Sequence, residues 1–256
     1  MKAVVLAGGE GARLAPYTRI LPKPLLPVGD QPILEIIVDQ LRDSGIDEIV
    51  LATGYLSSLI ETYFGDGSAF GIPISYVREN RPLGTAGALA AVGTLDSPFL
   101  VMNGDILTEP FYADLCAAHQ ASEATATIAT RQEELTLDYG IVRMDDRPGA
   151  VARVLRIDEK PRYVVDVSLG VSVFEPSVLD YIEADRRLDF PDLIGVLTGA
   201  GELVQSFRHS GYWLDVGTVH RLESGLKDFE EGAERWIKRV KSDPRRRGAD
   251  DRETRP

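Results

Sequence analysis

A glycine-rich run directly follows the first apolar stretch of the sequence. Lys2–Ala7 is almost entirely apolar, and Gly8, Gly9 and Gly11 come next, with Arg13 two residues later. Glycines let the backbone turn tightly and come close to a ligand, and successive backbone N–H groups then form a concave nest for an anion. The guanidinium of an arginine adds a forked, charged donor that suits phosphate oxygens. The run therefore favours a site for a phosphorylated ligand.

Two common phosphate-binding motifs do not fit this run. The dinucleotide fingerprint G-x-G-x-x-G needs a third glycine where Leu14 stands. A Walker A loop ends in Gly-Lys-Ser/Thr, which is absent. A simple strand-terminating turn explains the glycines equally well if they are considered alone.

A stiff segment with one charge follows at Leu21–Gly29. Pro22, Pro24 and Pro27 restrict the backbone to extended conformations, and Lys23 is the only charged residue in the segment. A lysine held between prolines loses little backbone entropy when it contacts a ligand. Without further context, a solvated lysine on a rigid loop is the favoured interpretation.

The two clusters gain meaning from the motifs that follow them. The motifs occur in this order: Gly8-Gly9-x-Gly11-x-Arg13, Leu21-Pro22-Lys23-Pro24, Pro32-x-x-Glu35, Tyr63–Gly67, Pro82–Leu89, Asn103-Gly104-Asp105, Tyr139-Gly140, Glu159-Lys160-Pro161 and Trp213-x-Asp215-x-Gly217-Thr218. With these motifs in this order, the sequence resembles the sugar-1-phosphate nucleotidyltransferase (nucleotide-sugar pyrophosphorylase) family. Within that family it is most similar to mannose-1-phosphate guanylyltransferases. The resemblance covers about residues 1–220.

The resemblance implies a reaction in which a sugar 1-phosphate attacks the α-phosphate of a nucleoside triphosphate (NTP). Pyrophosphate leaves and a nucleotide sugar forms, so that catalysis consists mainly of positioning and charge neutralisation. The implied catalytic residues are Arg13, Lys23 and Asp105, and the implied ligands of a Mg²⁺ cofactor are Asp105 and Asp215. Asp105 closely follows the apolar run Phe99–Met102, at the carboxyl end of an expected strand, where open α/β sheets bind ligands.

The resemblance also implies two sets of binding residues. The nucleotide-binding set is Leu6, Ala7, Gly8, Gly9, Gly11, Ala12, Arg13, Glu79, Pro82, Gly84, Thr85, Gly87, Asn103 and Gly104. The sugar-phosphate-binding set is Gly140, Glu159, Lys160, Ser168, Gly170 and Trp213, with Lys160 holding the incoming phosphate. Two residues depart from the family pattern: Ala12 stands where relatives often have a hydroxyl residue, and Ser168-Leu169-Gly170 replaces Asn-Ala-Gly. The second departure leaves the identity of the sugar open.

Glu79 bears on the identity of the base. Guanine presents N1–H and N2–H₂ as adjacent donors, which a carboxylate accepts with both oxygens. Uracil and thymine present one N–H between two acceptors, which suits an amide better. The glutamate therefore favours GTP, and mannose 1-phosphate is the expected acceptor. Three alternatives remain. One is the same chemistry with dTTP, UTP or CTP and glucose 1-phosphate or with a heptose 1-phosphate, and another is a non-catalytic nucleotide-sugar-binding regulator. The third is a plain binding module or a dinucleotide-dependent enzyme that uses the glycine loop.

Short apolar runs alternate with helical patterns in the first half of the chain. We expect strands at 2–7, 48–53, 74–77 and 99–102, with helices at 33–41, 56–64 and 85–92 between them. Such alternation predicts βαβ units, and hence an α/β, Rossmann-like, mostly parallel or mixed central sheet flanked by helices. The second half is rich in short β patterns, which predicts a smaller β-rich sugar-binding lobe, and helices return at 190–197 and 219–241. The sequence has no internal repeat of the kind that forms a β-helix, so no C-terminal β-helix is expected.

We expect a catalytic domain at 1–237, with a nucleotide half at about 1–110 and a sugar-phosphate half at about 111–237. The remaining segment, 238–256, has eight basic and four acidic residues and almost no apolar ones, which predicts a disordered basic tail.

The overall composition limits the partners. The chain has 28 Lys+Arg against 40 Asp+Glu, a formal charge of -12, which argues against nucleic acid or an anionic membrane as a partner. One cysteine, Cys116, rules out an internal disulfide framework. The sequence shows no targeting pattern and no membrane span, so that a cytoplasmic protein is expected. A homodimer is compatible with the sequence, which does not specify one.

Overall fold

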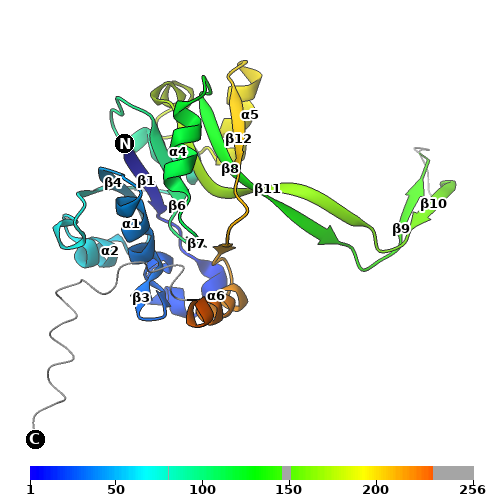
Figure 1. Ribbon diagram of the computed structural model, residues 1–256, viewed down its shortest axis with the longest axis horizontal. Coiled ribbons are helices and arrows are strands. Elements are labelled where there is room, and N and C mark those ends of the chain that lie inside the picture. The colour runs from blue at the N-terminus through cyan, green and yellow to red at the C-terminus, as the bar shows by residue number, and fades with distance from the viewer. Residues whose placement is uncertain (80, 146–150, 233–256) are drawn as a thin grey trace, which may run out of the picture.

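A single seven-stranded sheet runs through the protein, in the strand order β12-β8-β11-β6-β1-β4-β5 (Figure 1). The computed structural model describes residues 1–79, 81–145 and 151–232. The strands of this sheet are β1 (Lys2–Ala7), β4 (Glu48–Thr53), β5 (Ile74–Arg78), β6 (Phe99–Asn103), β8 (Ala126–Thr136), β11 (Arg162–Phe174) and β12 (Val204–Arg208). Neighbouring strands pair in parallel, except that β11 runs antiparallel to both β6 and β8.

Helices cover both faces of the sheet. They are α1 (Ile33–Asp43), α2 (Ser57–Phe64), α3 (Gly84–Gly87), α4 (Tyr112–Gln120), α5 (Phe190–Gly199) and α6 (Val219–Gly232). Alternate residues of β1 belong to two separate buried clusters. Ala3 and Val5 belong to the cluster that includes α1, whereas Val4 belongs to the cluster that includes α5. Burial on both faces explains why these parallel strands read as continuous apolar runs rather than alternating ones. The α/β fold class predicted from the sequence is confirmed.

Most element boundaries in the first half agree with the sequence prediction, and one helix does not. The helix predicted at 85–92 is divided into α3 and a 3₁₀ turn at Ala88–Ala91, because Gly84 and Gly87 pack closely against the 186–189 segment instead of continuing a regular helix. The helix predicted at 219–241 is described only to Gly232. The predicted basic tail, 238–256, lies outside the described residues.

Three small two-stranded sheets complete the fold. One is β2 (Pro27–Val28) with β3 (Gln31–Pro32), which connects the proline-rich segment to α1. Another is β7 (Ile106–Thr108) with β13 (Trp213–Asp215), and the third is β9 (Ile141–Met144) with β10 (Val154–Asp158). The pairing of β7 with β13 places Asp215 opposite Ile106, and therefore next to Asp105.

The β-rich region expected in the second half divides between the main sheet and a long arm (Figure 1). β12 pairs only with Ala126–Thr130 of β8, and β6 pairs only with Val171–Phe174 of β11. Beyond these residues, β8 and β11 continue as a two-stranded ribbon, and β9 and β10 form its tip. We call residues 131–145 and 151–168 the arm.

One face of the arm's tip is apolar and exposed to solvent. Val142 stands opposite Ile157 and Met144 opposite Val154, and these side chains are between 44% and 62% exposed. The polar side chains of the tip pair with one another instead, since the Arg143 Nε donates to Asp158 at 3.0 Å. The tip therefore lacks the packed core that the body of the sheet has.

In the described part of the chain, no helix is both long enough and apolar enough to cross a membrane.

Candidate active site

Two cavities open on the carboxyl-end edge of the parallel strands. The first cavity has a volume of ≈ 700 Å³ and the second ≈ 450 Å³. Thr85 and Asn103 line both of them, so that the two cavities adjoin. Ligands of open α/β sheets bind at this edge, because the loops that follow neighbouring strands meet there.

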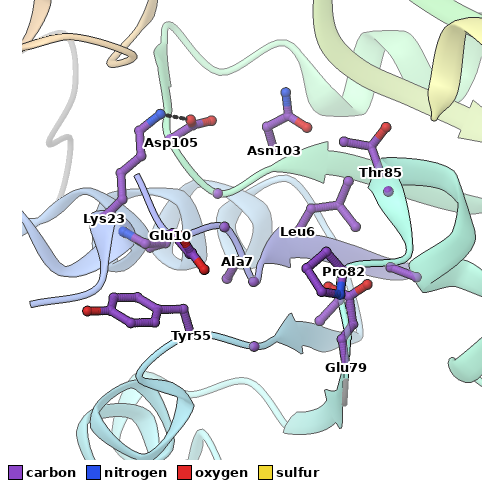
Figure 2. A pocket seen from close by; sticks show the side chains of 18 of the residues that line it. Leu6, Ala7, Glu10, Lys23, Tyr55, Glu79, Pro82, Thr85, Asn103 and Asp105 are labelled. Carbon is purple, nitrogen blue, oxygen red and sulfur yellow. Dashed lines mark hydrogen bonds and ion pairs between the residues drawn. The ribbon is translucent and has the colours of Figure 1, made fainter. Parts of the chain in front are cut away.

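The first cavity is built mainly from the loops after β1, β4, β5 and β6 (Figure 2). Its lining contains most of the predicted nucleotide-binding residues, together with the predicted catalytic Lys23 and Asp105. The predicted residues in the lining are Leu6, Ala7, Gly8, Gly9, Glu79, Pro82, Gly84, Thr85, Asn103 and Gly104. A side-chain carbon on Gly9 would meet no atom within 4 Å, so the backbone there faces open space, as a phosphate-binding loop requires.

Four of the predicted nucleotide-binding residues do not line the first cavity. Gly11 packs against the side chain of Lys23, Ala12 begins an exposed 3₁₀ turn, and Gly87 lies against the carbonyl of Arg186. Arg13 is exposed, and its guanidinium points toward Gly217, where a side-chain carbon would lie 3.3 Å from Nη2. The guanidinium therefore lies close to the loop that carries Asp215.

Lys23 and two carboxylates form the charged centre of the site. The ammonium of Lys23 donates to Asp105 Oδ2 (Figure 2). It also lies 4.0 Å from Asp215 Oδ1. Asp215 is brought there by the β7–β13 pairing and by a 3.0 Å hydrogen bond from the backbone N–H of Val216 to the carbonyl of Asp105. The side chain of Lys23 is only 12% exposed, so that this ion pair is poorly screened by water.

Burial raises the pKa of Asp105 above its ordinary value, and the charge of Lys23 opposes that rise. A carboxylate in such surroundings needs a cation beside it to stay ionised. Asp105 lines the first cavity and Asp215 lines the second, so the charged centre lies where the two cavities meet.

Glu79 lies at the opposite end of the first cavity from Lys23 (Figure 2). Its Oε1 accepts the backbone N–H of Leu83 at 3.3 Å, and its backbone N–H donates to the carbonyl of Thr53. Its Oε2 comes close to Gly8, where a side-chain carbon would lie 2.7 Å from it. Burial raises the pKa of Glu79.

The second cavity contains half of the predicted sugar-phosphate-binding residues. Ser168, Gly170 and Trp213 line it, and the indole N–H of Trp213 donates to the carbonyl of Leu169 at 3.0 Å. Phe190, Pro191 and Ile194 from the start of α5 form an apolar wall. No lysine or arginine is among the described residues that line this cavity.

Gly140, Glu159 and Lys160 lie on the arm, outside the linings of both cavities. Gly140 and Glu159 are neighbours, since a side-chain carbon on Gly140 would lie 3.1 Å from Glu159 Oε2. Lys160 sits at the bend of the arm with a φ of +41°, a left-handed conformation that is uncommon outside glycine. The extended strand from Arg162 to Ser168 alone spans roughly 20 Å, which separates Lys160 from the rim of the second cavity.

Sequence reasoning missed several residues of the first cavity. Gly54 and Tyr55 follow β4, so the rule that ligands bind beyond strand ends would have identified them. Asp189 gave no such signal, because it lies about 100 residues further along the chain than the loop it contacts. Its carboxylate accepts the backbone N–H of Thr85 at 3.1 Å. Arg81 also lines the cavity.

The chain belongs to the Nucleotidyl transferase family, whose sequence pattern it matches over residues 2–232. Among curated relatives, it is 33% identical over 239 residues to a UTP–glucose-1-phosphate uridylyltransferase of Synechocystis, covering 86% of this chain and 61% of the relative. It is 33% identical over 234 residues to a mannose-1-phosphate guanylyltransferase of Mycobacterium tuberculosis, covering 90% of this chain and 65% of the relative. It is 36% identical over 224 residues to a mannose-1-phosphate guanyltransferase of Schizosaccharomyces pombe, covering 85% of this chain and 61% of the relative. The chain thus spans about three-fifths of the length of these relatives.

Solved structures share the fold. A provisional glucose-1-phosphate thymidylyltransferase of Bacillus anthracis superposes with a TM-score of 0.71 at 24% identity, covering 89% of this chain and 94% of that one. HddC of Yersinia pseudotuberculosis superposes with a TM-score of 0.67 at 22% identity, covering 89% and 99%. At these identities, the likeness establishes the fold alone.

Proposed function

We propose that the protein transfers a nucleotidyl group from an NTP to a sugar 1-phosphate and releases pyrophosphate. One observation carries the proposal: the cluster of Lys23, Asp105 and Asp215 lies where two adjoining cavities meet. A transfer reaction between two bound phosphates needs such a place, with positive charge between a nucleotide on one side and a sugar on the other. The names of the relatives support the same reaction class.

The nucleotide fits the first cavity with its base at the Glu79 end and its phosphates at the Lys23 end. Oε1 of Glu79 is already engaged by Leu83, so that the remaining acceptor capacity of the carboxylate is available to the adjacent N–H donors of guanine. The glycine loop and Lys23 would then contact the phosphates, and Arg13 would approach the departing pyrophosphate from outside the cavity. These positions favour GTP as the substrate.

Asp105 and Asp215 are suited to hold Mg²⁺. Mg²⁺ is bound in nucleotide enzymes by one or two carboxylates, and phosphates and water supply its other ligands. The two carboxylates already converge on a cation, the Lys23 ammonium, so their arrangement fits this donor set. When bound, the ion supplies charge neutralisation at the α-phosphate.

The sugar 1-phosphate fits the second cavity, with mannose 1-phosphate as the expected acceptor. Ser168 offers a hydroxyl and Trp213 a broad apolar face to the sugar. The lining has no cation for the incoming phosphate, and we propose that Lys160 provides it, supported by Glu159 and Gly140 beside the sugar hydroxyls. For this contact the arm has to bend toward the body.

The chemical step needs no covalent intermediate on the protein. A phosphate oxygen of the sugar 1-phosphate forms a bond to the α-phosphorus of the NTP, and the bond between that phosphorus and the α–β bridging oxygen breaks. Pyrophosphate carries away the electron pair. Lys23 lies where negative charge accumulates at the α-phosphate, and the glycine-loop N–H groups lie where it accumulates on the leaving group.

A substrate panel tests the proposal. The protein is incubated with Mg²⁺ and each combination of GTP, dTTP, UTP or CTP with mannose, glucose or heptose 1-phosphate, and pyrophosphate release is measured. We expect the highest kcat/KM for GTP with mannose 1-phosphate, and no turnover after chelation of the metal. Absence of pyrophosphate release with every combination would refute the function, whereas preference for UTP or dTTP would refute only the interpretation of Glu79.

The homodimer, which is compatible with the sequence, stays a prediction.

A further inference from the structure

The loop Pro82–Gly87, which lines the first cavity, rests on a segment from the far half of the chain. The carbonyl of Leu188 accepts the N–H groups of Ala86 and Gly87 at 3.0 and 2.9 Å, and its own N–H donates to the carbonyl of Leu83 at 2.8 Å. These backbone bonds attach the loop to the residues just before α5.

A reciprocal pair of side-chain hydrogen bonds extends this attachment to the cavity wall. Asp189 Oδ1 accepts the backbone N–H of Thr85 at 3.1 Å, and Thr85 Oγ1 accepts the backbone N–H of Phe190 at 2.9 Å. Asp189 and Thr85 both line the first cavity. Each side chain therefore satisfies an N–H group of the other segment, in the manner of a capping box.

Gly84 allows the two segments to come this close. It has a φ of +80°, and a side-chain carbon there would lie 2.5 Å from the carbonyl oxygen of Leu188 and 2.7 Å from Asp189 Oδ1. Both the conformation and the space exclude any larger residue. The glycine in this motif is thus required by contact with the Leu188–Asp189 segment, whatever else it contacts.

The two partners are not equally fixed. α5 is anchored in the core by Leu193 and Leu197, which are fully buried. Gly84 and Thr85 lie partly exposed on the cavity wall. A lost contact between Asp189 and Thr85 would therefore shift the wall and leave the helix in place.

We propose that Asp189 is a positioning residue for the nucleotide, which acts by holding the Gly84–Thr85 wall of the first cavity through the N–H of Thr85. The proposal rests on the proposed function, since it assigns the nucleotide to the first cavity. Asp189 holds the wall from α5, whose first residues, Phe190 and Pro191, line the second cavity. The position of the nucleotide would thus depend on a residue outside the sequence motifs quoted above.

Steady-state kinetics of two variants test the proposal. Asp189→Ala should raise the KM for GTP by about tenfold, the value of one hydrogen bond to a charged group, because the wall loses its anchor. The kcat should stay within about twofold, and the KM for mannose 1-phosphate should rise by less than that for GTP, because Thr85 lines both cavities whereas Gly84 lines only the first. Asp189→Asn should restore the wild-type KM for GTP, since its amide oxygen accepts the same N–H. Asp192→Ala, which removes an exposed carboxylate from the first turn of the same helix, is the matched control.

Amide hydrogen exchange separates a failure of this proposal from a failure of the proposed function. In the protein without substrates, the Thr85 amide should exchange faster in Asp189→Ala than in the wild type or in Asp189→Asn. This readout holds even if no substrate pair is turned over. Unchanged exchange at Thr85 in Asp189→Ala would overturn the proposal. A KM for GTP in Asp189→Asn as high as in Asp189→Ala would also overturn it, because the charge of the carboxylate, which also pairs with Arg187 at 3.3 Å, would then matter rather than the hydrogen bond to Thr85.

Discussion

The first cavity and the arm differ in how they hold the residues expected to bind substrate. In the first cavity, Gly8, Glu79 and Asp105 follow three different strands of one sheet and therefore converge at one edge. On the arm, Glu159 and Lys160 lie between β10 and β11, where the two-stranded ribbon has left the sheet. The residues of the first cavity are fixed by strands that pair in parallel with buried neighbours. The residues of the arm are supported only by the two strands of the ribbon, which pair with one another.

This difference assigns different requirements to the two substrates. On the proposed function, the nucleotide would find its contacts already assembled, whereas the sugar phosphate would recruit its proposed cation from the arm. Binding of the nucleotide is therefore expected to need little rearrangement, and binding of the sugar phosphate to need a bend of the arm.

The largest effects are expected at the charged centre. Lys23→Met and Asp105→Asn should each lower kcat/KM by about 10³-fold, because each removes charge or ligation that acts on the transferring phosphate. The measurement is pyrophosphate release with GTP and mannose 1-phosphate. Lys227→Met, at an exposed lysine of α6, is the control and should retain activity. Activity in Lys23→Met close to the wild-type value would remove the charged centre from the mechanism.

The next contrast compares the stability of the body with that of the arm. Leu100→Ala in β6 should lower the free energy of unfolding by about 2–5 kcal/mol, since Leu100 is fully buried. Leu155→Ala in β10 should change it by less than about 0.5 kcal/mol, since Leu155 is 60% exposed. Urea denaturation measures both values. A loss in Leu155→Ala as large as in Leu100→Ala would mean that the tip of the arm is packed in solution.

Lys160→Ala should raise the KM for mannose 1-phosphate by about tenfold or more, and leave the KM for GTP unchanged. A lysine hydrogen-bonded to a phosphate is worth roughly this factor. Arg156→Ala, which removes an exposed cation from the same arm, is the matched control. Equal changes in both KM values would show that Lys160 does not distinguish the two substrates.

Glu79→Gln should raise the KM for GTP by about tenfold and lower that for UTP or dTTP. The ionised carboxylate accepts the donors of guanine, and burial raises the pKa of Glu79, so affinity for GTP should be full above that pKa and be lost as the pH falls through it. Affinity in Glu79→Gln should not follow this pH profile. The effect is measured by titrating GTP binding against pH in the wild type and in Glu79→Gln. Identical pH profiles in the two proteins would exclude Glu79 as the residue that recognises the base.

The sequence allowed residue positions to be predicted at strand ends, whereas the roles of these residues stay predictions. Asp105 follows β6, and its position at the sheet edge follows from the apolar run before it. Arg13 was expected among the phosphate contacts, but it lies outside the first cavity, because Gly11 turns the chain into an exposed 3₁₀ turn.

Contacts between distant segments were not predictable from local patterns. The 85–92 helix was predicted from its small residues, and it is interrupted because Gly84 and Gly87 pack on a segment that begins about 100 residues later. The course of the arm depends on where β8 and β11 lose their outer neighbours, and strand propensity carries no such information.

A measurement of how far the arm bends tests most directly whether the arm, unlike the first cavity, has to move to bind its substrate. Spin labels at Ile20→Cys, an exposed position of the body, and at Leu155→Cys on the arm, in a protein with Cys116→Ala, report the distance between arm and body. Pulsed electron spin resonance would be recorded without ligand, with GTP and Mg²⁺, and with GDP-mannose and Mg²⁺. We expect the distance to stay the same with GTP and to shorten with GDP-mannose. An unchanged distance at saturating GDP-mannose, in a labelled protein that still turns over, would contradict the account.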